Sequence, residues 1–319
     1  MNTVGLITRV NIGEMPYFQS FVDHHQKLGV SSLHLALQDS GGYLSNFRWH
    51  QLKIHFHYNS TTWMKGNADM LNYVENDWVM MLDVDEYIRV PRNFESIQEI
   101  INSKINCSTI MVDWILHPRI CCTDGPTNGI AVKGGKMLAR KDTVLNIRND
   151  HWFSVATSLE PHIIPGFKIQ HDWGRGYQDV LIKSALSRFN DGKKSSLSDL
   201  KSSSKVPLRL AALGCLHIAV STADSLHLQN DCLVFPIDYM KLNQALLVAG
   251  ISNDTLALNS RKLQVILILA KRFRSDLSRS QSMKKVLRIA ERLRHDFQQQ
   301  QQLQKPLWNN AFPIDCRYT

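Results

Sequence analysis

Short apolar runs alternate with stretches of helical periodicity along the first hundred residues. Four such runs predict strands, at residues 4–8, 32–37, 52–58 and 78–82. After the first run, Phe18, Phe21 and Val22 follow a helical spacing behind Pro16, and residues 66–75 repeat this kind of pattern. Strands that alternate with helices of this length are typical of a doubly wound, mostly parallel sheet with helices on both faces, so we expect the α/β class.

The later part of the chain continues this pattern less regularly. Residues 94–101 predict another crossover helix, residues 109–116 predict a strand, and a Ser- and Lys-rich stretch is typical of a loop or linker. From Arg261 onward, apolar side chains recur at helical spacing while Lys and Arg occupy the other faces. The expected organisation is a domain over 1–190, a linker over 191–205, a mixed part of the domain over 206–260, a basic amphipathic helical extension over 261–304 and a tail over 305–319.

The charge of the chain is concentrated near its C-terminus. Of the 319 residues 44% are hydrophobic and 20% are charged, which is ordinary globular composition. Residues 261–297 hold 11 Lys/Arg against 3 Asp/Glu, whereas residues 1–260 hold 24 of each. A basic amphipathic helix either lies on an anionic membrane surface or packs its apolar stripe on the domain, and the second is the commoner arrangement. No nucleic-acid-binding motif accompanies the charge, so nucleic acid is not an expected partner.

Cysteine spacing and the lengths of the apolar runs bear on the compartment. The six cysteines show neither paired Cys-x-x-Cys spacing nor the density of a disulfide-stapled scaffold, and we predict free thiols in a reducing environment. Residues 4–7 form too short an apolar core for a signal peptide, and no apolar run reaches the roughly 18 residues of a membrane span. We expect a cytoplasmic protein, with peripheral contact at the inner face of the membrane as an option for the basic helix.

The fourth apolar run stops abruptly at the carboxylates Asp83, Asp85 and Glu86. If the strand continues through them, Asp83 and Asp85 project to the same side and aim at one spot. Two close carboxylates repel unless positive charge lies between them, and Mg²⁺ or Mn²⁺ takes such oxygen ligands. Ligands of open α/β sheets also bind beyond the carboxyl ends of the strands. The sequence therefore predicts a site for a divalent cation here, with a solvated acidic turn as the alternative.

Three blocks of the sequence resemble one enzyme family. Residues 78–88, WVMMLDVDEYI, resemble the D-x-D-E-[FY] signature of nucleotide-sugar glycosyltransferases with the GT-A fold, in the branch allied to families 2 and 92. Residues 8–30 and 169–183 resemble two further blocks of this branch, and the resemblance covers about residues 4 to 190. It departs from the family at Ile12 and Gly13, which interrupt an Asn-Glu pair, and in the block that begins at Trp114. It implies a GT-A-like fold and metal-dependent, inverting transfer of a hexose from a nucleotide sugar, of the UDP type, to a glycan or lipid-linked acceptor.

The resemblance also implies roles for individual residues. Asp85 would bind the metal, Asp83 would bind the metal, its water or the ribose, His171 would complete the metal site, and Glu86 would orient nearby groups. The donor-binding candidates that it adds to Asp83 are Arg9, Glu14, Asp39, Lys136 and Arg140. Lys65 is a further donor-binding candidate from its position alone, because it precedes a predicted helix and could neutralise a phosphate. From the residues alone, the carboxylate at position 39 is equally well a turn cap and the lysine at 65 equally well a surface residue.

An inverting transfer needs a base that takes the proton of the acceptor hydroxyl group. Asp113, which interrupts an apolar strand, and Asp150 are both candidates, and the sequence does not choose between them. Asp113 could instead be a hydrogen-bonded partner in the core, because a carboxylate inside an apolar strand is costly unless it is paired or neutral.

Two other functions compete with the transferase interpretation. A Mg²⁺-dependent phosphatase of the haloacid dehalogenase type also ends an apolar strand in Asp-x-Asp, but that family has Thr or Val where Tyr87 stands and carries the motif on its first strand. A non-catalytic adaptor with a degenerate transferase domain would use the basic helix to bind a membrane or a partner. The departures at Ile12, Gly13 and Trp114 favour this adaptor, and the intact acidic motif disfavours it.

Overall fold

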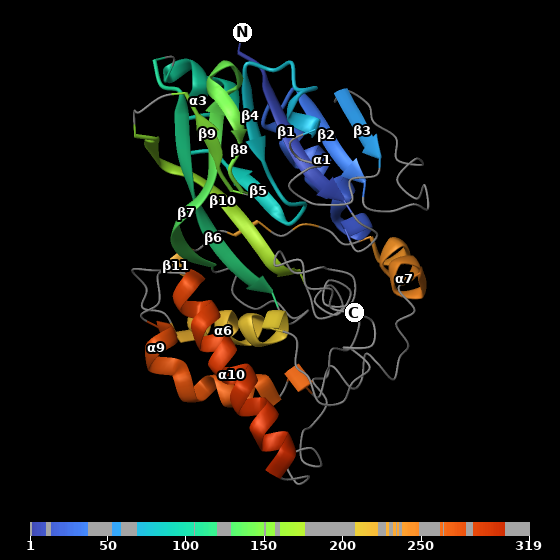
Figure 1. Cartoon of the computed structure of the whole chain (residues 1–319), viewed down its shortest axis with the longest axis vertical. Coiled ribbons are helices and arrows are strands. Elements are labelled where there is room, and N and C mark those ends of the chain that lie inside the picture. Colours follow the sequence, from blue (N-terminus) through green and yellow to red (C-terminus); the bar gives the residue numbers. More distant parts are fainter. Residues whose placement is uncertain are drawn as a thin grey trace. The chain divides into compact units, whose positions relative to one another are not determined.

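The computed structural model describes the chain in stretches separated by gaps (Figure 1). These stretches are residues 2–10, 14–37, 53–58, 69–104, 106–119, 129–149, 151–156, 160–175, 208–222, 228–229, 232–233, 235, 238–248, 262–263, 265–278 and 283–303. The candidate residues Asp39, Lys65 and Asp150 lie outside them, as do the predicted linker 191–205 and the predicted tail 305–319.

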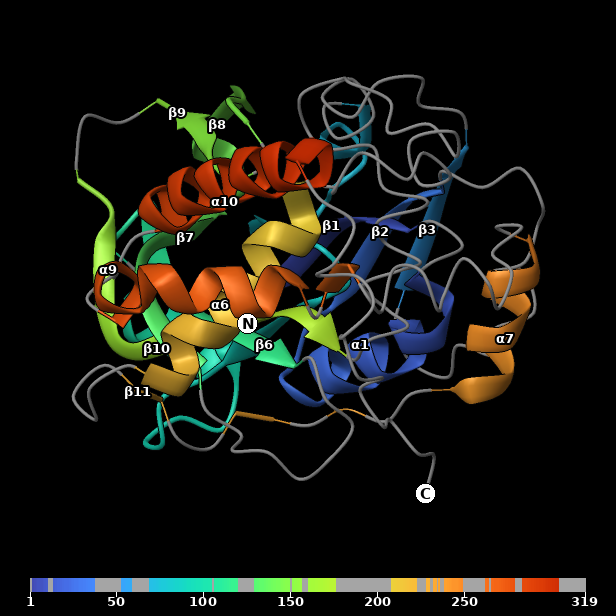
Figure 2. The same cartoon turned by 90° about the horizontal axis from the view of Figure 1, so that it is seen from below.

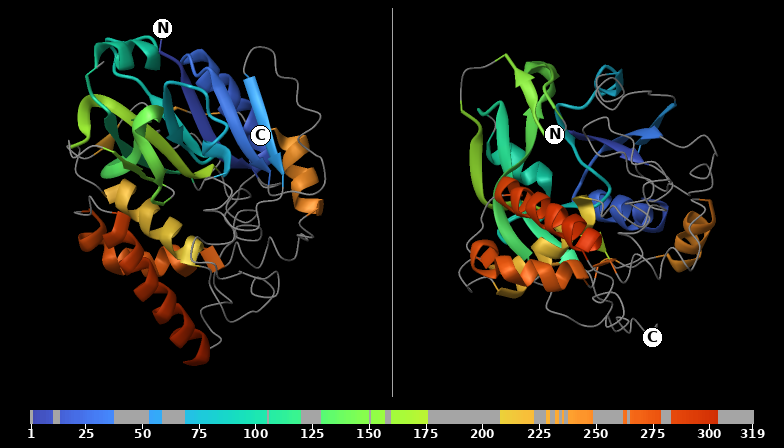
Figure 3. Two further views of the ribbon diagram at one scale, coloured as in Figure 1. Left: turned by 45° about the horizontal axis from the view of Figure 1, so that its top comes forward. Right: turned by 60° about the horizontal axis from the view of Figure 1, so that its bottom comes forward.

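Within the described residues, nine strands form one sheet in the order β3-β2-β1-β4-β7-β6-β10-β5, with β11 paired to β7. Their bounds are β1 Val4–Val10, β2 Ser32–Leu37, β3 Lys53–Tyr58, β4 Trp78–Met81, β5 Glu86–Arg89, β6 Thr109–Arg119, β7 Gly129–Arg140, β10 His162–Arg175 and β11 Leu228–Gln229. The first four strands are parallel to one another, and β1, β2 and β3 lie side by side (Figure 3). β7 runs antiparallel to β4, and β5 runs antiparallel to β10.

The central strands β1 and β4 are buried on both faces, as a sheet covered on both sides requires, whereas the sequences of β2 and β3 alternate apolar with polar residues. In β1, Leu6 and Ile7 project to opposite faces and both are buried. The face that carries Ile7 packs on Met70 and Leu71, and on Phe153 of the small hairpin formed by β8, Val144–Ile147, and β9, Phe153–Val155. The predicted α/β class is confirmed, and the antiparallel half of the sheet is a feature that the sequence did not indicate.

Two helices follow strands of the N-terminal half. Helix α1, Met15–Lys27, has Pro16 in its first turn and ends before Gly29, whose φ of 84° few other residues adopt readily. Helix α3, Ile97–Ser103, begins later than predicted, because the hydroxyl of Ser96 accepts a hydrogen bond from the N–H of Glu99 and caps the helix there.

The C-terminal part of the chain is mainly helical in its described residues. Its helices are α6 Leu208–Thr222, α7 Tyr239–Val248, α9 Arg274–Ser278 and α10 Met283–Leu303. Helices were predicted within 261–304, whereas α6 and α7 lie in the stretch 206–260 that was predicted to be mixed. The apolar stripe of α10, which includes Val286, Leu293 and Phe297, is buried, and the helix packs across α6 (Figure 2). The sequence left open whether the apolar stripe contacts a membrane or packs on the protein, and in the structure it packs on the protein. None of the helices in the described ranges is both long and apolar enough to cross a membrane.

Two compact units interleave along the chain. One comprises residues 1–114, 133–171 and 235–238, and the other comprises the remainder. The domain boundaries proposed from the sequence stay a prediction. The three cysteines within the described residues, Cys107, Cys215 and Cys232, are free thiols, as predicted.

Candidate functional site

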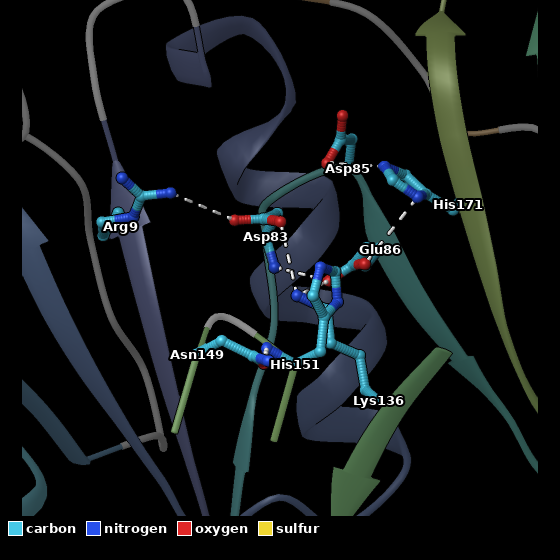
Figure 4. A network of polar contacts seen from close by, with 8 residues as sticks. All are labelled: Arg9, Asp83, Asp85, Glu86, Lys136, Asn149, His151 and His171. Atoms are coloured by element: carbon cyan, nitrogen blue, oxygen red, sulfur yellow. Dashed lines mark hydrogen bonds and ion pairs between the residues drawn. The ribbon is translucent and has the colours of Figure 1, made fainter. Parts of the chain in front are cut away.

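Asp83 and Asp85 lie in the turn between β4 and β5, and Glu86 is the first residue of β5. β4 ends at Met81, and the N–H of Glu86 donates a hydrogen bond to the carbonyl oxygen of Asp83 over 2.9 Å, which closes a four-residue turn before β5. We predicted that Asp83 and Asp85 point to one spot because they lie in a strand. That prediction is wrong, because the two residues lie in a turn. The turn directs the two carboxylates to different partners (Figure 4).

Asp83 lies between two cations. Its Oδ1 is 3.7 Å from Nη2 of Arg9 at the end of β1, and its Oδ2 is 3.4 Å from Nζ of Lys136 on β7. Burial works to raise the pKa of Asp83, but the charges of Lys136 and Arg9 outweigh it and hold that pKa below its usual value. The side chains of Asp83 and Arg9 are 37% and 19% exposed, so this part of the network is accessible to a ligand.

Lys136 and Glu86 form the buried base of the site. Nζ of Lys136 lies 3.1 Å from Oε2 of Glu86, and their side chains are 1% and 0% exposed. The same Oε2 accepts a hydrogen bond from the N–H of Asp83 over 2.8 Å. Burial raises the pKa of Glu86 to about 7, although Lys136 opposes this. Because Glu86 is out of reach of solvent, its position fits the predicted orienting role and not direct contact with an acceptor.

His171 on β10 lies next to the turn formed by residues 83–86, which we call the acidic turn. It pairs with Glu86 in the register of β10 and β5, its Nε2 lies 3.6 Å from Oδ1 of Asp85, and its Nδ1 lies 3.8 Å from Oε1 of Glu86. The ring also lies 5.0 Å from that of Trp114. Asp85 and His171 are both buried, so each is confined to this position by its surroundings.

The pair formed by Asp85 and His171 fits a divalent cation. Two ligands about 2.1 Å from one ion lie about 3.0 Å apart at the right angle of an octahedral site, so the two side chains, now 3.6 Å apart, would close by about 0.6 Å on binding. The second ring nitrogen of His171 faces Glu86, as outer carboxylates face metal-binding histidines. Within the described ranges no three His, Cys, Asp or Glu side chains are arranged to hold a metal ion. Mg²⁺-type sites often use only one or two protein ligands and complete their shell with water and phosphate oxygens.

Arg140 lies away from this network, contrary to its predicted donor-binding role. In the register of β7 and β4, Arg140 pairs with Trp78, where β4 begins, whereas Asp83 follows the end of β4. The strand separates the two positions by about 10 Å at roughly 3.3 Å per residue. Arg140 forms an ion pair of 2.7 Å with Asp142 instead, and both side chains are exposed.

The remaining candidates lie at other positions. Asp113 is half-buried on β6 and accepts a hydrogen bond from the N–H of Gly134 over 3.0 Å, at a point where Gly134 has a φ of 79°. Asp113 is therefore hydrogen-bonded, but at the surface and not in the core as the alternative supposed, and its role as a base stays a prediction. Glu14 stands directly before α1, at the carboxyl-end side of β1, and its donor-binding role also stays a prediction.

The structure adds residues that the sequence did not assign to the site. The carbonyl oxygen of His151 accepts a hydrogen bond from the N–H of Met137, which is next to Lys136. The His151 ring lies 5.0 Å from that of Trp114. Asn149 accepts the N–H of His151 over 2.8 Å and completes the group drawn in Figure 4. His24 and His25 of α1 contact the backbone of Ile88 in β5, two residues after Glu86. The only sequence signal for these two histidines was their place in a block that resembles the transferase branch.

Comparisons with known proteins give no family assignment. No family model matches the sequence, and no curated protein matches it. Among solved structures, TarS 1-349 of S. aureus in complex with UDP-GlcNAc matches over 92% of both chains, at 10% identity and a TM-score of 0.35. HddC from Yersinia pseudotuberculosis matches over 53% of this chain and 89% of its own, at 10% identity and a TM-score of 0.32.

A third solved structure, CMP:2-keto-3-deoxy-manno-octonic acid synthetase complexed with CTP, matches over 44% of this chain and 75% of its own. Its identity is 11% and its TM-score is 0.29. Since none of these TM-scores reaches 0.5, the similarities do not establish a family for the chain.

Proposed function

We propose that this protein is a metal-dependent glycosyltransferase that transfers a hexose from a UDP-linked sugar to a glycan or lipid-linked acceptor. The observation that carries the proposal is the convergence of Asp83, Asp85 and Glu86 with His171, Lys136 and Arg9 from three other strands. This network lies where the parallel strands β1 and β4 end, which is where open α/β sheets bind their ligands.

The accessible and buried halves of the network suit different tasks. Arg9 and Asp83 are partly exposed, so Arg9 would contact the donor diphosphate while Asp83 would contact the ribose or a metal-bound water. Lys136 is buried between Asp83 and Glu86. We therefore assign it to holding these two carboxylates in place, and not to the direct phosphate contact that the resemblance implied.

Asp85 and His171 would hold the cation, Mn²⁺ or Mg²⁺, and Glu86 would fix the orientation of the His171 ring. When bound, the ion supplies Lewis-acid stabilisation of the departing nucleoside diphosphate. The acceptor hydroxyl would attack the anomeric carbon with inversion while a carboxylate takes its proton. Asp113 and Asp150 remain the candidates for that base.

The basic face of α10 is proposed as a peripheral contact with anionic lipid at the inner face of the membrane, in the cytoplasm. This face comprises the exposed side chains Lys284, Lys285, Arg288 and Arg292. Because the apolar stripe of α10 is buried against the protein, such a contact would be electrostatic and would not insert apolar side chains. It would suit an enzyme whose acceptor is lipid-linked.

The phosphatase alternative finds little support in the same geometry. Its motif requires a small polar or β-branched residue at position 87, where Tyr87 is fully buried against aromatic rings. Its catalytic strand also comes first in the chain, whereas three strands precede β4. The adaptor alternative makes a different prediction, namely that no nucleotide sugar binds.

The proposal is tested by incubating a panel of nucleotide sugars with the protein and Mn²⁺ or Mg²⁺, and by measuring release of nucleoside diphosphate. Wild type should hydrolyse one donor slowly, and Asp85→Asn should abolish the metal-dependent signal. Asp142→Asn, an exposed carboxylate beyond the other end of β4, is the matched control and should behave as wild type. Absence of binding to every nucleotide sugar in the presence of either metal would reject the transferase and favour the adaptor.

A further inference from the structure

Strand β5, which carries the end of the acidic motif, lies at the end of the strand order. Among the described strands it pairs with β10 alone, and Ile88 faces Ile169 in that register. An edge strand leaves backbone N–H and C=O groups without a strand partner on its outer side. At Ile88, two histidine side chains of α1 form hydrogen bonds with the backbone N–H and C=O groups.

His25 accepts the N–H of Ile88. Its Nδ1 lies 2.8 Å from the carbonyl oxygen of Phe21, and because a carbonyl oxygen only accepts, Nδ1 must carry the proton. Nε2 is then the acceptor, and it lies 3.4 Å from the backbone nitrogen of Ile88. His25 is fully buried, so water does not compete for this contact.

His24 meets the other backbone group of the same residue. Its Nε2 lies 2.7 Å from the carbonyl oxygen of Ile88 and must therefore donate a proton to it. Together the two imidazoles hold Ile88 as the backbone of a further strand would. We call this pair of contacts the histidine clasp.

Tyr87, between Glu86 and Ile88, is fixed by aromatic packing. Tyr87 is fully buried, with its ring stacked 3.6 Å from that of Phe235 and 6.1 Å from that of His25. The ring of Phe21 packs edge-on against Tyr87 at 6.1 Å. The chain that leaves the acidic turn is thus fixed at two consecutive positions, both by groups of α1.

We propose that His24 and His25 are positioning residues that hold β5 so that Asp85 and Glu86 stay within reach of His171. This inference rests on the proposed function for its link to metal binding. The separations of Asp85 and Glu86 from His171 are 3.6 and 3.8 Å. Movement of β5 along α1 by even about 1 Å would separate the carboxylates from the ring, and such small displacements in supporting residues typically weaken a site strongly.

The test compares three variants by two measurements. His25→Phe keeps the aromatic stacking but removes the acceptor, His25→Gln restores an acceptor near the position of Nε2, and His162→Phe changes an exposed histidine on β10 as the control. Hydrogen exchange by mass spectrometry follows the backbone amides of residues 84–89. Water-proton relaxation follows binding of Mn²⁺ alone to the full-length folded protein.

In His25→Phe we expect the amides of residues 84–89 to exchange faster with solvent. Mn²⁺ should bind about 10-fold more weakly, the lower end of the effect of losing an outer-shell partner, because His25 acts on the ligands only through the backbone of β5. His25→Gln should recover most of both effects, and His162→Phe should match wild type. Faster exchange with unchanged Mn²⁺ affinity would overturn the proposal, because a merely structural role predicts that result. Unchanged exchange would also overturn it. If wild type itself binds no Mn²⁺, the proposed function fails, and the exchange of residues 84–89 alone decides whether the clasp positions the turn.

Discussion

Replacing Glu86 by glutamine tests the electrostatics of the buried base of the site. Burial raises the pKa of Glu86 from its ordinary value of 4.5 to about 7, so the folded chain holds this proton more tightly than the unfolded chain does. Stability from Glu86 is therefore fully present below pH 4.5 and is lost as the pH rises to 7. At about 1.4 kcal/mol for each pH unit, the loss amounts to about 3 kcal/mol.

The amide of a glutamine side chain does not titrate, so Glu86→Gln should remove this loss while keeping an oxygen for the N–H of Asp83. The measured quantity is the free energy of unfolding in urea at about pH 5 and about pH 8, for the variant minus wild type. Titrating groups that do not interact with Glu86 contribute equally to both proteins and cancel in this difference, which should rise by about 3 kcal/mol between the two pH values. Glu95→Gln, an exposed carboxylate, is the control and should give a flat difference.

A flat difference for Glu86→Gln, within about 1 kcal/mol, would refute the assignment of a buried carboxyl group with a raised pKa. A direct check comes from ¹³C spectra of protein labelled at its Glu carboxyl carbons. One resonance should titrate near pH 7 in wild type and be missing from Glu86→Gln. A Glu86 signal that titrates near 4.5 would contradict the reasoning even if the stabilities agreed.

Four further predictions follow from the same structure. Asp85→Ala should weaken Mn²⁺ binding by more than the roughly 10–100-fold typical of outer-shell losses, measured by water-proton relaxation. Arg140→Ala should leave donor hydrolysis within about twofold of wild type, because its side chain lies beyond the other end of β4. Burial, aided by His24, lowers the pKa of His25 well below 6.5, so wild type should lose stability as the pH falls below about 6.5, and His25→Gln should lose less in urea unfolding. Reversing three charges on the basic face of α10 should reduce binding to anionic vesicles by at least about 100-fold in sedimentation, at about 1 kcal/mol per charge, and leave neutral vesicles unaffected.

The parallel half of the sheet was predictable because its strands are short runs that are either apolar throughout or alternate apolar with polar residues, and because helical spacing follows the first run and precedes the fourth. β2 has the bounds that the sequence predicted, and β1 and β3 differ from prediction at one end only. β5 was not predicted, because Tyr87 and Ile88 are apolar and continue the pattern of β4. The break between β4 and β5 depends on a hydrogen bond from Glu86 to Asp83, which hydrophobic patterning does not encode.

The candidate site was predictable where residues carry charge in a recognisable block. Asp83, Asp85, Glu86 and His171 were chosen for that reason, and the structure brings all four into one network. His24 lies in a block that resembles the transferase branch but was not chosen, because it acts on a backbone carbonyl and carries no charge pattern of its own. Residues that work through backbone contacts carry no pattern that charge or spacing would reveal.

Lys136 was predicted to belong to the site and does, but its buried position gives it a different role from the one predicted. It was predicted to bind the donor, yet it is buried, and it lies 53 positions along the chain from Asp83, which it contacts. Its charge already offsets Asp83 and Glu86, and Arg140 is too distant. Arg9 is the partly exposed cation that the described network presents to a ligand, and it also contacts Asp83. A single guanidinium does not neutralise a diphosphate, so donor binding at this site requires further positive charge, and Asp85 with His171 offers the place where a divalent cation would supply it.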